Sequence, residues 1–134
     1  MATNKKKLML KTFGTQLKSF LTFIDETIPG NEDIESLNTV LSLLIQCNPK
    51  KIIYLWAYYI AQPYISIIEK GDFSYLENKD ISNDVKDLKD NAAYVLECYN
   101  KTIKIISKLD KAIKKEAINY IQILSRLSIE YHKN

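Results

Sequence analysis

The fold is decided by the stretch NPKKIIYLWAYYIAQPYISIIEKG, which occupies residues 48–71. Between Lys51 and Glu69 it contains 17 consecutive residues without a formal charge, and apolar side chains fall on nearly every side of a helix. Such a helix must be covered by lipid or by other helices. A membrane span needs about 20 strongly apolar residues, whereas this stretch contains Gln62, Pro63, Ser66 and several tyrosine hydroxyls. The sequence therefore predicts a central core helix and no membrane span.

Pro63 interrupts this central helix. Proline has no backbone N–H and its ring clashes with the preceding turn, so it kinks or restarts a helix. We therefore expect two pieces, 49–61 and 63–70, with Gly71 ending the second. A core that takes Ile53, Trp56 and Ile60 buries the tryptophan.

The rest of the chain has the composition of a helical protein that can cover such a core. Its 134 residues are 46% hydrophobic and 26% charged, which fits one globular domain over 1–134. Only three glycines and three prolines punctuate it, too few for a sandwich of short strands. We expect an all-α fold, an irregular bundle of about five helices around the Pro-kinked central one.

Two helices are predicted before the central stretch. Apolar residues step by three and four through 4–28 until Pro29-Gly30 stops the pattern. The basic residues 1–7 before it are expected to form a frayed tail. Asn31 is a good cap for a second helix over 32–47, and Asn48 can cap the central one.

Two further helices are predicted after an irregular connection. Residues 71–82 lack a sustained period, and Phe73, Tyr75 and Leu76 within them are expected to fold onto the core. A helix is then predicted from 82 or 83, in which apolar residues, beginning with Val85 and Leu88, follow a clean repeat. A break near 109–111 is expected to separate it from the last helix.

The cysteines and the N-terminal residues indicate in which cellular compartment the protein resides. Cys47 and Cys98 both fall inside apolar helical pattern, so we expect two reduced, buried thiols in a reducing compartment. The run 8–10 is cut short by Lys11 and makes no signal-peptide core. These features predict a cytoplasmic protein.

The sequence offers no constellation for catalysis. His132, the single histidine, cannot build a His-based triad or a His-rich metal site alone. Glu97 and Glu116 lack the Glu-x-x-His spacing of a di-metal bundle, and there is no glycine-rich phosphate loop. We therefore predict a protein that is not an enzyme, with no catalytic residue, metal ligand or cofactor.

Tyrosine is the first candidate for a binding role, with nine residues in the chain. Tyr54, Tyr58 and Tyr59 surround Trp56 on one helix, so some of them must point outward. Tyrosine is enriched at protein interfaces because it is large, stiff and amphipathic. These three residues are a possible surface for a protein partner or for self-association. The alternative is that their rings belong to the core and their hydroxyls reach its rim.

Lysine is the second candidate. The net charge is only +3, but one run of lysines steps by three and four along a predicted exposed face. This lysine ridge could neutralise phosphates of a nucleic acid or an anionic lipid; alternatively it is only a solvated helix face. It consists of Lys101, Lys104, Lys108, Lys111 and Lys115.

Several short motifs carry a resemblance. In chain order they are Asn48-Pro49, Pro63-Tyr64, Gly71-Asp72 followed by aromatic residues and Leu76, Lys79-Asp80, and YIQILSRLS at 120–128 followed by Tyr131. This pattern resembles that of small helical proteins encoded by large nucleocytoplasmic DNA viruses of amoebae and algae. The resemblance implies a viral origin and a place in the host cytoplasm or the virion, without an assigned activity.

Two functions follow as expectations. The first is a non-enzymatic interaction or structural protein that acts through protein contacts. The alternative is a nucleic-acid-associated accessory protein that binds phosphates through the lysine ridge.

Overall fold

The computed structural model describes residues 2–71, 73 and 91–133, and within them the chain is all-α. The helices are α1 (Ala2–Thr27), α2 (Glu32–Cys47), α3 (Pro49–Leu55), the π-helix η1 (Trp56–Ala61), α4 (Gln62–Lys70), α7 (Asn91–Ile106) and α8 (Lys111–Lys133). The predicted all-α bundle is confirmed.

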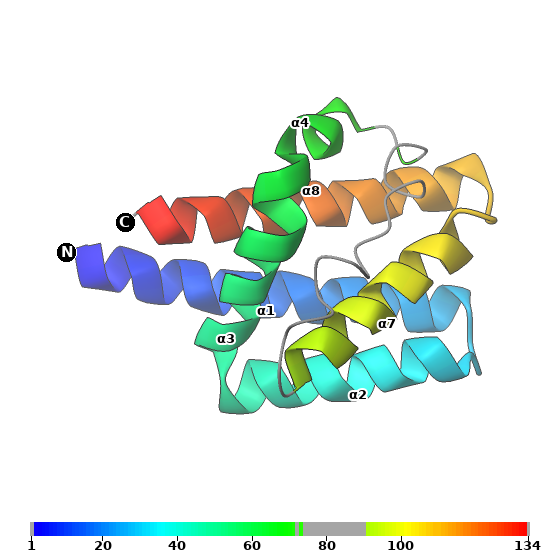
Figure 1. The fold of residues 1–134 in the computed structure, drawn as a ribbon, viewed down its shortest axis with the longest axis horizontal. Coiled ribbons are helices and arrows are strands. Elements are labelled where there is room, and N and C mark those ends of the chain that lie inside the picture. Colours follow the sequence, from blue (N-terminus) through cyan, green and yellow to red (C-terminus); the bar gives the residue numbers. More distant parts are fainter. Residues whose placement is uncertain (1, 72, 74–90, 134) are drawn as a thin grey trace.

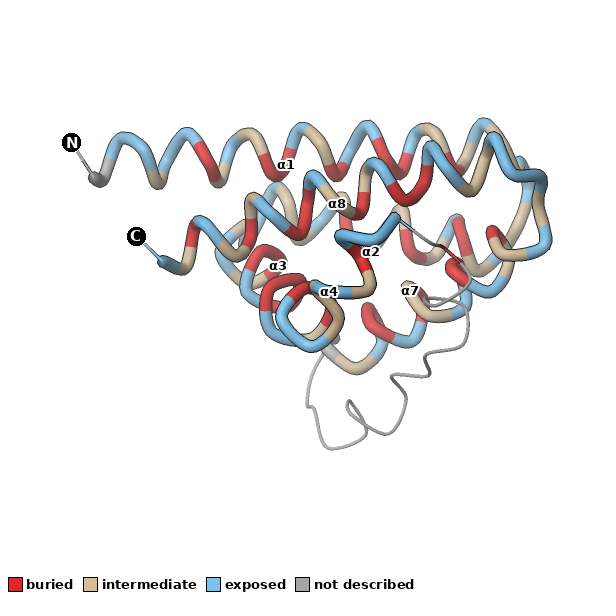
Figure 2. The backbone as a smooth tube through the Cα atoms, turned by 90° about the horizontal axis from the view of Figure 1, so that it is seen from above, coloured by how far each residue is buried: buried red, intermediate tan, exposed pale blue. Residues whose placement is uncertain are grey.

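The two longest helices, α1 and α8, lie side by side, and their free ends lie at the same end of the molecule (Figure 1). The continuous rod of α3, η1 and α4 runs across both of them, while α7 packs on α2. Seen from above, α1 forms one edge of the molecule and turns its buried positions towards the other helices (Figure 2). The central stretch is therefore covered on the side that faces α1, α2 and α8, whereas the prediction of burial on nearly every side is corrected, because Tyr54, Tyr58 and Ser66 stay exposed on the opposite side.

The buried side of this rod is continuous across α3 and η1. Trp56 is only 2% exposed, and its Nε1–H donates to the Oγ of Ser125 on α8 at 3.0 Å. The rings of Phe13 and Tyr99 approach its indole edge-on, with centroids at 6.0 and 5.5 Å. The predicted burial of Trp56 is confirmed, as is that of Ile53 and Ile60.

The kink at Pro63 has more structure than the sequence indicated. Pro63 cannot donate to the carbonyl of Tyr59, and the helix widens to π geometry in the turn before it. The N–H of Gln62 accordingly donates to Ala57, five residues back. Beyond the proline, Tyr64 leaves helical geometry at φ −125° and ψ 17°. The two predicted pieces are present, and the end of the first, Trp56–Ala61, is π-helical.

Polar caps set the other boundaries. The Asn31 Oδ1 accepts from the N–H groups of Asp33 and Ile34 at 3.0 and 3.2 Å, and α2 has its predicted bounds. Asp110 Oδ1 accepts from the N–H of Ile113 at 3.0 Å and opens α8, so the predicted break is confirmed. Gly30 and Gly71 follow α1 and α4 with positive φ values of 78° and 71°.

Two predictions are corrected. Cys47 is exposed at the last turn of α2, because the buried positions there have already ended at Leu41; only Cys98 is a buried thiol. The residues predicted as a frayed tail over 1–7 are helical from Ala2 onwards, because α8 lies alongside them.

The predicted connection and the start of the following helix lie mostly outside the described residues. This applies to Tyr75, Leu76, Val85 and Leu88, whereas Phe73 is buried as predicted. Over the ranges that the structure describes, no helix combines the length and the apolarity needed to cross a membrane.

Candidate functional site

Tyr54 and Tyr58 form an exposed pair at the surface of the central rod. They are 46% and 42% exposed, and their ring centroids are 4.5 Å apart. The two residues are one turn apart along α3 and η1, so the side chains stand on the same side of the helix. Each ring thus limits the rotamers of the other, and together they present a fixed aromatic surface.

His132 of α8 completes this surface. Its ring lies 6.2 Å from that of Tyr54 and 5.4 Å from that of Tyr58, edge-on to both. Its Nδ1–H donates to the carbonyl oxygen of Ser128 at 2.8 Å, which fixes the orientation of the imidazole. Tyr54, Tyr58 and His132 therefore form one aromatic surface, which we call the tyrosine face. His132 is 74 residues from Tyr58 in the sequence and joins it only because α8 runs beside the rod.

Cations lie around the tyrosine face. Lys6 Nζ stands over the ring of Tyr131, 4.7 Å from its centroid, and that ring lies 5.1 Å from His132. Lys50 is exposed one turn before Tyr54, and Lys133 is exposed next to His132. The surroundings of the face thus carry cations on the side of α1 and of α3, while the end of α8 carries both Lys133 and the exposed Glu130.

Of the three tyrosines that the sequence proposed, Tyr59 does not join the other two. Tyr59 is half-buried and packs against the core, because the next position after Tyr58 points to another side of the helix. For Tyr59 the alternative reading, a core ring with its hydroxyl at the rim, fits better. His132 and Lys6 were missed, because nothing in the sequence shows that the ends of α1 and α8 meet.

The lysine ridge is exposed but divided. All five of its lysines are exposed, yet α7 ends at Ile106 and Lys111 begins α8, so the ridge is not one helix face. Lys101 Nζ lies 3.9 Å from the carboxylate of Asp33. At the turn, Lys114 Nζ donates to the carbonyl of Ser107 at 3.5 Å.

Within the described residues, the titratable side chains do not gather into a reactive group. Among the residues described, no three His, Cys, Asp or Glu side chains come together as a metal site. Glu97 and Glu116 are both exposed and belong to different helices, α7 and α8. Burial raises the pKa of the Cys98 thiol, which keeps it protonated and poorly nucleophilic at neutral pH.

Comparisons with protein-family models, with curated proteins and with solved structures found no match. The resemblance to helical proteins of large DNA viruses therefore stays a prediction.

Proposed function

We propose that this protein is a non-enzymatic interaction protein that binds another protein through the tyrosine face. The observation that carries the proposal is the contact between Tyr54 and Tyr58, two large rings that stay more than 40% exposed while touching each other and His132. Exposed tyrosines are common singly, but a fixed cluster of aromatic rings is typical of a binding surface.

The energetics of association support this assignment. Tyrosine buries a large area with few rotatable bonds, so it loses little conformational entropy when it becomes fixed in an interface. Here the ring contact and the hydrogen bond of His132 have already reduced that freedom in the free protein. A partner can therefore cover the face with little further ordering.

The charges around the face favour a different protein as the occupant over a second copy. In a two-fold symmetric dimer the same patch faces itself, so the cations of one copy, such as Lys6 and Lys50, would approach cations of the other. A partner with an aromatic or apolar anchor flanked by acidic side chains would match both the rings and the cations. We therefore assign an acidic protein surface as the occupant.

The test compares two variants with the same kind of substitution. Tyr54→Ser with Tyr58→Ser removes the face, and Tyr94→Ser is the matched control, because Tyr94 is 44% exposed on α7. Each protein is used as bait in extracts of the cells that express it, and retained proteins are quantified against the wild type. We expect a partner that the double variant loses and the control keeps.

Two outcomes would overturn this assignment. Equal retention by the double variant and the control would exclude the tyrosine face as the contact. Concentration-dependent dimerisation of the purified chain that the double variant abolishes, measured by sedimentation velocity, would identify a second copy as the occupant.

A second candidate function is binding of a nucleic acid through the lysine ridge, which the exposure of all five lysines supports. Replacing Lys104, Lys108 and Lys111 with Glu should then abolish retention on nucleic acid at low salt. Equal retention of both forms, or of neither, would exclude it.

The viral origin, with the host cytoplasm or the virion as the place of action, is a separate proposal. It rests on the motifs of residues 48–131 and is tested by looking for the protein in purified virions.

A further inference from the structure

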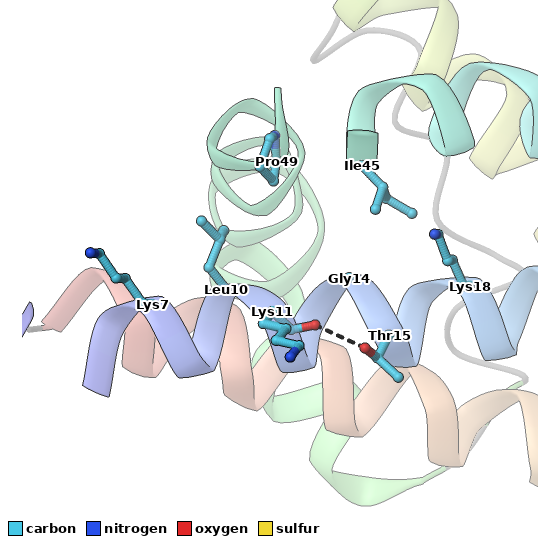
Figure 3. Close-up of a pocket in the computed structure, with 8 residues that line it drawn as sticks. All are labelled: Lys7, Leu10, Lys11, Gly14, Thr15, Lys18, Ile45 and Pro49. Carbon is cyan, nitrogen blue, oxygen red and sulfur yellow. Dashed lines mark hydrogen bonds between the residues drawn. The ribbon is translucent and has the colours of Figure 1, made fainter. Parts of the chain in front are cut away.

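A concave site lies on the other flank of α1, between that helix, the end of α2 and the start of α3 (Figure 3). It is a cavity of about 390 Å³, at the small end of the range of roughly 300–1,000 Å³ that small-molecule sites occupy. We call it the lysine-rimmed groove, because Lys7, Lys11 and Lys18 of α1 line it and no acidic residue does.

The floor of the groove is apolar. Leu10 points from α1 towards Pro49 at one end, and Ile45 of α2 points towards α1 at the other (Figure 3). Between them lies Gly14, where a Cβ would stand 3.4 Å from the Ile45 Cγ2. The missing side chain at this position keeps the floor open.

The three lysines of the rim are exposed, and they are spaced by four and seven residues, so they follow one side of α1. Lys101 pairs with Asp33 and Arg126 pairs with Glu69, and neither of these ion pairs involves the rim. Lys7 and Lys11 are four residues apart on α1, and like charges at this spacing repel each other. An anion bound beside them would reduce that repulsion.

The apolar floor and the cationic rim point to one class of ligand. We propose that the lysine-rimmed groove binds a small anionic amphiphile, a single carboxylate on a short aliphatic chain. The chain would cover Leu10, Ile45 and Pro49, and the carboxylate would accept charge-assisted hydrogen bonds from the rim. Because the apolar floor lies between α1, the end of α2 and the start of α3, a single short chain fits it better than the plane of a lipid bilayer does.

The first experiment is a calorimetric titration of the full chain with octanoate, with acetate and 1-octanol as probes that lack the chain or the charge. We expect saturable one-to-one binding of octanoate, no binding of acetate, and about tenfold or more weaker binding of 1-octanol, because one charge-assisted hydrogen bond is worth about a factor of ten. Amide shifts confined to α1, Ile45 and Pro49 should accompany octanoate binding.

The second experiment uses charge-matched variants. Replacing Lys7, Lys11 and Lys18 with Gln should weaken octanoate binding at least about tenfold. Replacing Lys108, Lys111 and Lys115 with Gln lowers the net charge by the same amount, and it should leave the affinity unchanged. All six lysines are exposed, so neither variant should unfold the chain.

Gly14→Ala is a third variant, in which loss of binding cannot be attributed to unfolding. Alanine favours an α-helix by about 1 kcal/mol over glycine, and the new methyl group would make only an ordinary contact with Ile45. We expect a raised Tm together with weaker octanoate binding.

Three results would overturn the proposal. They are the absence of saturable octanoate binding, equal weakening in both lysine variants, and binding of the wild type to phosphatidylglycerol vesicles without binding of free octanoate. The last would identify a membrane surface as the ligand.

Discussion

Ser125 shows how one small polar residue holds the core of this bundle. It is fully buried on α8, and its hydroxyl is the acceptor for the indole N–H of Trp56. A buried tryptophan needs such an acceptor because an unpaired N–H in an apolar core is unfavourable. The pair therefore determines which position of α8 faces the central rod.

Ser125→Ala should lower the free energy of unfolding by about 1–3 kcal/mol, because it leaves the indole N–H without a partner. In a Trp56→Phe background the donor is already gone, and the same substitution should cost clearly less. Urea denaturation measures both, with Ser66→Ala on the exposed side of α4 as the control. If Ser125→Ala lowers the free energy of unfolding equally in the two backgrounds, the lost hydrogen bond is not the cause of the destabilisation.

Tyr99 makes stability depend on pH in the alkaline range. Burial, and secondarily the neighbouring Tyr64, raises the pKa of the Tyr99 phenol above its ordinary value of 10.0. The unfolded chain then loses this proton at a lower pH than the folded chain does. The free energy of unfolding is therefore unaffected by this group below pH 10 and falls above it, by at most about 1.4 kcal/mol per pH unit.

Tyr99→Phe removes this ionisation, so its stability should fall less steeply than that of the wild type between pH 10 and 11.5. Tyr58→Phe, at an exposed tyrosine, is the control and should follow the wild type. Urea midpoints across this range measure the difference. Parallel curves for Tyr99→Phe and the wild type would contradict the assigned burial.

At the scale of elements, the central rod depends on the turn between Trp56 and Ala61. Pro63 removes one donor from the ladder, and the π geometry before it shifts the residues on either side relative to a straight α-helix. Trp56 faces Ser125, while Tyr54 and Tyr58 stay on the surface beside His132. Helical spacing places the tryptophan opposite the two tyrosines, but it does not predict the π turn, since the period changes inside the element.

The turn between α1 and α2 allows a direct test of a helix boundary. Gly30 has a φ of 78°, and a Cβ there would meet nothing within 4 Å. Gly30→Ala should therefore lower the free energy of unfolding by about 1–2 kcal/mol through the backbone alone. Gly30→Asn should cost less, because asparagine tolerates the left-handed conformation better. Chemical denaturation of both variants measures this; the prediction fails if both cost the same.

At the scale of the whole molecule, the sequence predicted the helices better than their contacts. The all-α class, the bounds of α2, the break before α8 and the burial of Trp56 follow from local rules about caps, prolines and apolar spacing. Cys47 was predicted to be buried because it ends an apolar run, but the core does not extend that far. Ser125 and Ser128 were missed because a search for apolar residues cannot find buried hydroxyls.

The candidate sites were predictable only in part, for the same reason. Tyr54 and Tyr58 follow from helical spacing, but His132 and Lys6 reach the tyrosine face only through the packing of α8 against α1 and the rod. The lysine-rimmed groove brings together α1, Ile45 and Pro49, which no local pattern connects. A surface built from several helices can be predicted only when the tertiary arrangement of those helices is known.

The most direct test of the central claim, that a partner covers the tyrosine face, is site-specific photocrosslinking in the cells that express the protein. The photoreactive residue benzoylphenylalanine replaces Tyr58 in one protein and Tyr94 in another, and adducts are identified by mass spectrometry. We predict one discrete protein adduct at position 58 and none at position 94. No adduct at position 58, or the same adduct at both positions, would contradict the claim.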